Sequence, residues 1–132
     1  MRKVRVAVVS AAAVLPMVFA TAAQATSWHS ISGTVKEGGA WYKSSTVRTV
    51  GSSGTTMQLS LSSAPSKGIQ WRLINAKNGK VFGSTVTIGS GGGARTLATN
   101  VLAGTLFQND FRQDSTCNFN CGSYNFSGSE YY

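Results

Sequence analysis

Strict alternation of apolar and polar residues is the feature that most constrains the fold of this chain. It is clearest over residues 57–62, which read MQLSLS, and it recurs over residues 69–73 and 82–88. Successive side chains of a β-strand point to opposite faces of the sheet, so this period of two predicts strands with one buried face. No amphipathic helix of useful length competes with that interpretation.

Turn signals separate the alternating segments. Residues 75–80 read NAKNGK, and Asn-Gly tolerates the positive φ that tight hairpins need. We therefore predict a hairpin between the strands at 69–73 and 82–88. The glycine-rich stretch 89–93 predicts a loop, and Ala103-Gly104 predicts a turn.

Less regular strand candidates complete the chain. An opening pair of strands is expected at 31–36 and 41–50, joined by the glycine turn at 37–39, and further strands are expected at 97–101, 105–112 and 122–126. About eight short strands at such spacing predict an all-β fold, as a small two-layer antiparallel β-sandwich. Its expected core consists of Leu59, Leu61, Trp71, Leu73, Phe82, Val86, Ile88, Phe111 and either Leu106 or Phe107.

The first 25 residues have the three-part pattern of a secretory signal peptide. A cationic start (MRKVR) is followed by an apolar run over 6–20 and by small residues at 23–25. That run is shorter than the roughly 20 residues of a membrane span, so no span is expected after cleavage. We expect residues 1–25 to be removed and residues 26–132 to form a single β-sandwich domain. The pattern is typical of bacterial export, which places the product in the medium or at the cell envelope.

The charge of the mature chain is modest. Three of the 12 Lys and Arg residues lie in the leader, so its removal lowers the formal net charge from +8 to +5. The remaining cations are scattered singly, whereas a dedicated nucleic-acid surface clusters Lys and Arg on one face. No specific nucleic-acid partner is therefore predicted. A scattered positive excess favours weak attraction to acidic polymers.

Cys117 and Cys121 are the only two cysteines. In an exported chain they most simply pair, so we predict a disulfide that closes a very small ring. Such a ring contributes about 2 kcal/mol, and it shapes a local loop more than it stabilises the fold. The spacing is one residue too long for a C-x-x-C motif and the single histidine, His29, is far away. No metal or cofactor is therefore predicted.

Groups that could exchange protons with a substrate are few. His29 closely follows the predicted cleavage point, where chain ends are mobile, so we expect it to be solvated. Asp110 and Asp114 are the nearest pair of acids, but on a strand they would lie about 13 Å apart, too far for a glycosidase pair. We expect a strand end there, in which Arg112 and Arg95 offset the acids. No catalytic residue is predicted.

Aromatic residues are the strongest remaining candidates for a binding site. Trp41 and Tyr42 follow two glycines closely, and Tyr131 and Tyr132 end the sequence. Flat sugar faces stack on exposed Trp and Tyr rings, although rings also serve core packing. Neighbouring residues on a strand point to opposite faces, so at most one of Trp41 and Tyr42 can belong to the core. These four residues are the predicted ligand-binding set.

Together these features favour a secreted, non-enzymatic binding protein that acts at the cell envelope or in the extracellular medium. The expected partner is a glycan or an anionic cell-wall polymer. Two alternatives stay open: a small secreted inhibitor that presents segment 117–121 or 89–93 to a protease or other enzyme, and a small secreted hydrolase. In architecture the mature part resembles small secreted bacterial β-sandwich proteins in general. No motif carries that resemblance, so it implies no residue role.

Overall fold

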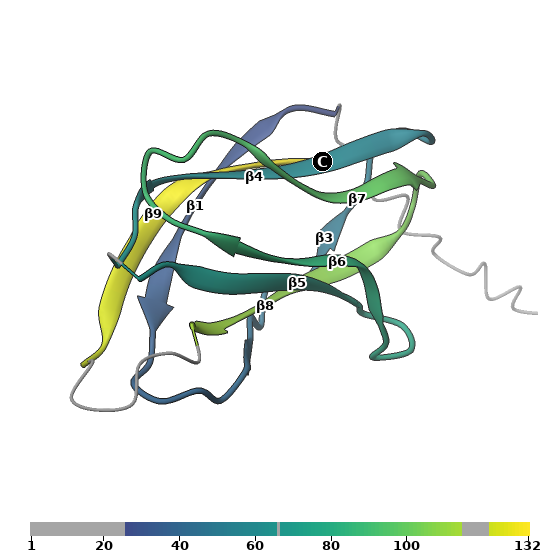
Figure 1. The fold of residues 1–132 in the computed structure, drawn as a ribbon. Coiled ribbons are helices and arrows are strands. Elements are labelled where there is room, and N and C mark those ends of the chain that lie inside the picture. The colour runs from purple at the N-terminus through teal and green to yellow at the C-terminus, as the bar shows by residue number, and fades with distance from the viewer. Residues whose placement is uncertain (1–25, 66, 115–121) are drawn as a thin grey trace, which may run out of the picture.

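The computed structural model describes residues 26–65, 67–114 and 122–132, and this part of the chain is all β. Its nine strands form two antiparallel sheets that pack face to face as a sandwich (Figure 1). The predicted fold class is thereby confirmed. None of the described residues forms a helix that is long and apolar enough to span a membrane. The predicted leader, residues 1–25, lies outside the described residues.

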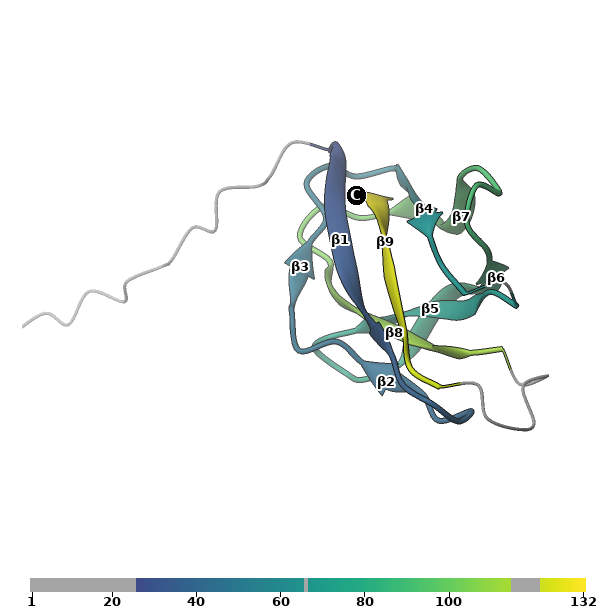
Figure 2. The same ribbon diagram turned by 90° about the vertical axis from the view of Figure 1, so that its left-hand side faces the viewer.

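The two sheets are called A and B here, and both are seen in Figure 2. Sheet A has the strand order β1-β9-β4-β7 and sheet B the order β2-β8-β5-β6, with β3 also paired to β8. The strands of sheet A are β1 (Trp28–Val35), β9 (Tyr124–Tyr131), β4 (Thr55–Ser63) and β7 (Arg95–Val101). Those of sheet B are β2 (Tyr42–Lys43), β3 (Arg48–Thr49), β8 (Leu106–Gln113), β5 (Ile69–Asn75) and β6 (Val81–Ile88).

The core lies between the sheets and contains the inward side chains that alternation predicted. Phe82 and Val86 are only partly buried and pack against the edge of this core. The sequence predicted that either Leu106 or Phe107 belongs to the core. Phe107 is fully buried, and Leu106 is not. The other predicted members, all buried, are Leu59, Leu61, Trp71, Leu73, Ile88 and Phe111.

The hairpin between β5 and β6 is also confirmed. The backbone N–H of Asn75 donates to the carbonyl oxygen of Lys80 at 2.8 Å. Gly79 takes a φ of +70°, the left-handed conformation that the Asn-Gly pair tolerates. The predicted loop over 89–93 and the turn at Ala103-Gly104 are present as well.

Two expectations about the strands are wrong. The expected opening pair does not pair: β1 lies beside β9, whereas β2 and β3 lie beside β8 in the other sheet. Alternation is a local property and does not specify which strand becomes the neighbour. The last strand is β9, Tyr124–Tyr131, rather than 122–126. Its later inward positions hold Gly128 and Glu130, which interrupt the apolar pattern.

The two lateral sides of the sandwich differ. On one side the edge strands β6 and β7 pack against each other across the two sheets. Gly83 permits this approach, because a Cβ atom at this position would clash with the carbonyl oxygen of Leu97. Gly83 also has a φ of +69°, which residues with a side chain rarely adopt. On the opposite side, β1 and residues 42–48 line a cavity of about 320 Å³, which we call the side cavity.

Candidate functional site

The outer face of sheet A carries small polar side chains in regular rows. Buried residues of β1, β9 and β4 alternate with outward Ser, Thr, Asn and Gln residues. Strand pairing aligns these side chains across the sheet, so that Ser30, Ser129 and Ser60 form one row. We call this surface the hydroxyl face. Its residues are Trp28, Ser30, Ser32, Thr34, Thr56, Gln58, Ser60, Ser62, Asn125, Ser127, Ser129 and Tyr131.

No residue of the hydroxyl face is charged. Its side chains contact one another across the strands: Thr34 Oγ1 donates to Asn125 Oδ1 at 2.9 Å, and the hydroxyl oxygens of Ser62 and Ser127 lie 3.3 Å apart. Each hydroxyl both donates and accepts, so these contacts leave hydrogen-bonding capacity for a ligand. The face is therefore polar, neutral and able to bind other hydroxyl groups.

Trp28 and Tyr131 form the aromatic end of the hydroxyl face. They lie opposite each other on β1 and β9, with ring centroids 5.4 Å apart and ring planes tilted by 55°. Trp28 is 47% exposed, which is unusual for so large an apolar ring. Beside it lies a shallow depression of about 310 Å³, lined by Trp28, Ser60, Ser62, Ala94, Gly128 and Ser129.

Trp41 and Tyr42 lie on opposite faces of sheet B, and neither belongs to the core. Trp41 packs over two guanidinium groups, with the Cζ atoms of Arg72 and Arg112 lying 3.9 and 4.5 Å from its ring centroid. Tyr42 lies against inward-facing Phe111, with centroids 5.4 Å apart, and is 42% exposed at the mouth of the side cavity. The two rings therefore belong to two different surfaces.

The two C-terminal tyrosines also separate. Tyr131 is on the hydroxyl face, whereas Tyr132 is 6% exposed and belongs to the core. Tyr132 meets Phe107 edge-on at 5.1 Å and stacks on His29 at 4.1 Å. His29 is thus part of β1 and packed on a ring, and the expectation of a solvated chain end is wrong. The four predicted residues occupy three surfaces and the core, so they do not form one site.

Asp110 forms an ion pair with Arg72. It is 4% exposed, and its Oδ2 accepts a hydrogen bond from Arg72 Nε at 2.7 Å. The expectation that Arg112 and Arg95 offset this acid is wrong, because Arg72 lies directly opposite Asp110 in the pairing of β5 with β8. Asp114 lies beyond the end of β8, so the two acids do not share a strand face.

A buried polar chain crosses the core beside the side cavity, and sequence reasoning missed it. Trp71 Nε1 donates to Asn109 Oδ1 at 3.1 Å, and Asn109 Nδ2 donates to Glu130 Oε2 at 2.8 Å. Arg48 Nε lies 3.8 Å from the same carboxylate oxygen. Among the described residues, Glu130 Oε1 and Arg48 Nη1 are buried without a hydrogen-bond partner.

Glu130 is fully buried, and this burial raises its pKa from 4.5 to about 7. The hydrogen bond from Asn109 and the charge of Arg48 act in the opposite direction and only partly offset the desolvation. The signal that could have found Glu130 is its place in β9. Phe126, Glu130 and Tyr132 are spaced at multiples of two residues, so all three face inward.

The alternation of β1 could likewise have shown that Trp28 is on the outer face. The polar positions Ser30, Ser32 and Thr34 alternate with buried residues, and the same period places Trp28 on the outer face.

The predicted disulfide between Cys117 and Cys121 lies outside the described residues and stays a prediction. Within the described residues, no group of three or more His, Cys, Asp and Glu side chains could hold a metal ion.

No family model, no curated protein and no solved structure matches this chain. The surfaces described above therefore carry the functional argument.

Proposed function

We propose that this chain is a secreted, non-enzymatic glycan-binding protein, and that the hydroxyl face is its binding surface. The observation that carries this proposal is the exposed ring of Trp28, which lies beside Tyr131 at the end of a neutral face rich in hydroxyl groups. A sugar ring has an apolar face of C–H groups and a rim of hydroxyl groups. The Trp28 ring can stack on the C–H face of the sugar, and the serine rows can form hydrogen bonds with its hydroxyl groups.

The shape of the face suits a polymer. From Trp28 to Thr34, β1 extends for about 20 Å by strand rise, which is long enough for several sugar units. The depression beside Trp28 offers a place where one unit is held more closely than the others. A glycan chain lying along the strands would therefore contact the aromatic end and the serine rows at once.

The distribution of charge favours a neutral stretch of glycan on this face. Binding to phosphate-rich polymers depends on Lys and Arg at the contact surface, and the hydroxyl face has neither. Arg72 and Arg112 are on sheet B, and Lys36 and Arg48 line the side cavity. Arg95 is on β7 of sheet A, but it is paired with inward-facing Leu59 and so is not on the hydroxyl face. The expected partner is therefore an extracellular or cell-wall glycan, bound through uncharged sugar units.

Co-sedimentation with insoluble polysaccharides tests this proposal. The mature protein is incubated with cellulose, chitin and purified cell wall, and the bound fraction is measured for wild type, Trp28→Ala and Trp41→Ala. Trp28→Ala should weaken binding about tenfold or more, as expected for a central aromatic contact. Trp41→Ala is the matched control and should bind as wild type does. Loss of binding in Trp41→Ala alone, or no binding to any of the three polymers, would contradict the proposal.

A further inference from the structure

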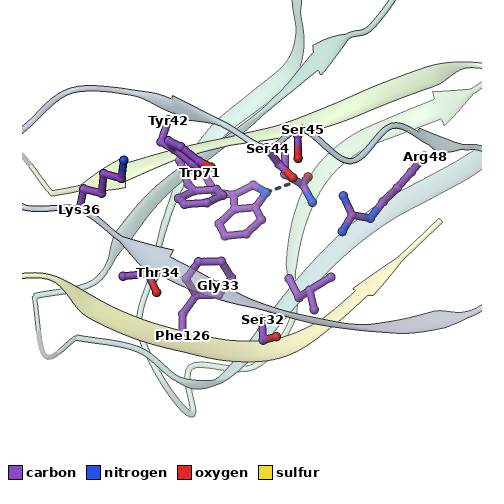
Figure 3. Close-up of a pocket in the computed structure, with 13 residues that line it drawn as sticks. Ser32, Gly33, Thr34, Lys36, Tyr42, Ser44, Ser45, Arg48, Trp71 and Phe126 are labelled. Atoms are coloured by element: carbon purple, nitrogen blue, oxygen red, sulfur yellow. Dashed lines mark hydrogen bonds between the residues drawn. The ribbon is translucent and has the colours of Figure 1, made fainter.

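The side cavity has an aromatic floor and hydroxyl-bearing walls (Figure 3). Trp71, Phe111 and Phe126 contribute the floor from strands of both sheets, and Tyr42 stands at the mouth. The volume of about 320 Å³ is at the lower end of the range for ligand sites, about 300–1,000 Å³. It suits one six-membered ring with its substituents. The walls carry the hydroxyl groups of Ser44 and Ser45, whereas Ser32 and Thr34 line the cavity through β1 and have their side chains on the hydroxyl face.

Arg48 reaches into the cavity from β3, as Figure 3 shows. Its side chain is only 18% exposed, and its Nε lies 3.8 Å from Glu130 Oε2. Its Nη1 is buried and has no hydrogen-bond partner within the described part of the chain. Nη1 itself has almost no accessible surface, so an anionic oxygen of a ligand would bind at the accessible part of the Arg48 side chain.

Glu130 does not fully neutralise Arg48. Because burial raises the pKa of Glu130 to about 7, much of this carboxyl group is protonated near neutral pH. A second cation lies at the mouth, where Lys36 Nζ is 5.3 Å from the ring centroid of Tyr42. Among the described residues, no Asp or Glu lines the cavity. The cavity is therefore electropositive at its inner end and at its mouth.

We propose that the side cavity binds a single sugar acid, with its carboxylate on Arg48, its ring on the aromatic floor and its hydroxyl groups on the serine walls. The hydroxyl-bearing walls favour a sugar ring over an aromatic acid, and the cations favour an acid over a neutral sugar. This inference is independent of the hydroxyl face, since the two surfaces use different aromatic and charged residues.

The indole N–H of Trp71 is a direct reporter for this cavity. The sequence has three tryptophans, and in the structure Trp28 lies on the hydroxyl face, Trp41 on the outer face of sheet B and Trp71 on the cavity floor. The ¹⁵N-labelled mature protein is titrated with glucuronate, glucose and benzoate. Glucuronate should shift the Trp71 signal with saturation and leave those of Trp28 and Trp41 in place. Glucose should bind about tenfold more weakly or worse, because it lacks the charged acceptor.

Variants test which residues hold the acid. Lys36→Gln and Tyr42→Ala change exposed positions and should keep the fold while weakening glucuronate binding by about threefold or more. Arg48→Gln should lose binding if its spectrum shows a folded protein, and Lys43→Gln is the matched cation outside the cavity. The proposal is overturned if glucuronate leaves Trp71 unchanged, if glucose or benzoate binds as well as glucuronate, or if Lys36→Gln and Tyr42→Ala bind as wild type does. A response of Trp28 to a neutral glycan, or its absence, has no bearing on these outcomes.

Discussion

Replacing Glu130 by glutamine should remove a large pH dependence from the stability of this protein. Glu130 is fully buried, and its pKa is raised from 4.5 to about 7 by that burial. Between these two values the folded state binds a proton that the unfolded state has released. The stabilising contribution is therefore complete below pH 4.5 and is lost as the pH rises through 7.

The size of the effect follows from the same two values. A pKa difference of about 2.5 corresponds to a change of about 3 kcal/mol in the free energy of unfolding over the full range. Between pH 5 and pH 8 the expected loss is about 2.5 kcal/mol. A glutamine at this position keeps an oxygen that can accept the hydrogen bond from Asn109 and never carries a charge. The Glu130→Gln variant should therefore lack this loss.

Urea unfolding followed by tryptophan fluorescence measures both proteins between pH 5 and pH 8. The difference between them isolates Glu130 from the other titrating groups. Glu37→Gln is the matched control, because it makes the same substitution at an exposed acid. Equal pH dependence in wild type and Glu130→Gln would refute the assignment of a raised pKa to this residue.

Two further substitutions test the packing. Trp71→Ala should cost about 3–5 kcal/mol, since it leaves a cavity in the core. Trp71→Phe should cost less, since it keeps an aromatic ring but removes part of the indole volume and the hydrogen bond to Asn109. A loss below about 1 kcal/mol for Trp71→Ala would show that this ring is not in the core. Gly83→Ala should cost about 2–4 kcal/mol from a left-handed φ and a clash with Leu97, whereas Gly104→Ala, with a similar φ and open space, should cost about 1–2 kcal/mol. Equal losses for both glycines in urea unfolding would contradict the close approach of β6 and β7.

The strands and most of the core could be predicted from sequence because both depend on a local pattern. The alternation around Leu59 and Trp71 determines which side chains face inward, whatever strand lies alongside. Strand partners are set by contacts between distant segments, so the pairing of β1 with β9 left no local signal. The partner of Asp110 was mistaken for the same reason, since Arg72 lies on a neighbouring strand.

The candidate surfaces were harder to predict. Tyr131 and Tyr132 are equivalent by composition, and only the position of β9 separates an outward ring from a core ring. Trp28 was not among the predicted binding residues, although the alternation of β1 extends to it. Glu130 breaks the rule that inward positions are apolar. Its burial depends on a hydrogen bond from Asn109, which is 21 residues away in sequence.

The central claim is that glycans bind through Trp28 on the hydroxyl face, and the indole signals of the three tryptophans test it most directly. Each signal is assigned with a Trp→Phe variant, and the ¹⁵N-labelled mature protein is titrated with soluble neutral oligosaccharides, including β-1,4-linked glucose and N-acetylglucosamine hexamers. The account predicts a saturable shift of the Trp28 signal, while those of Trp41 and Trp71 stay in place. A shift of Trp41 without Trp28, or no response of Trp28 to any neutral oligosaccharide, would contradict it.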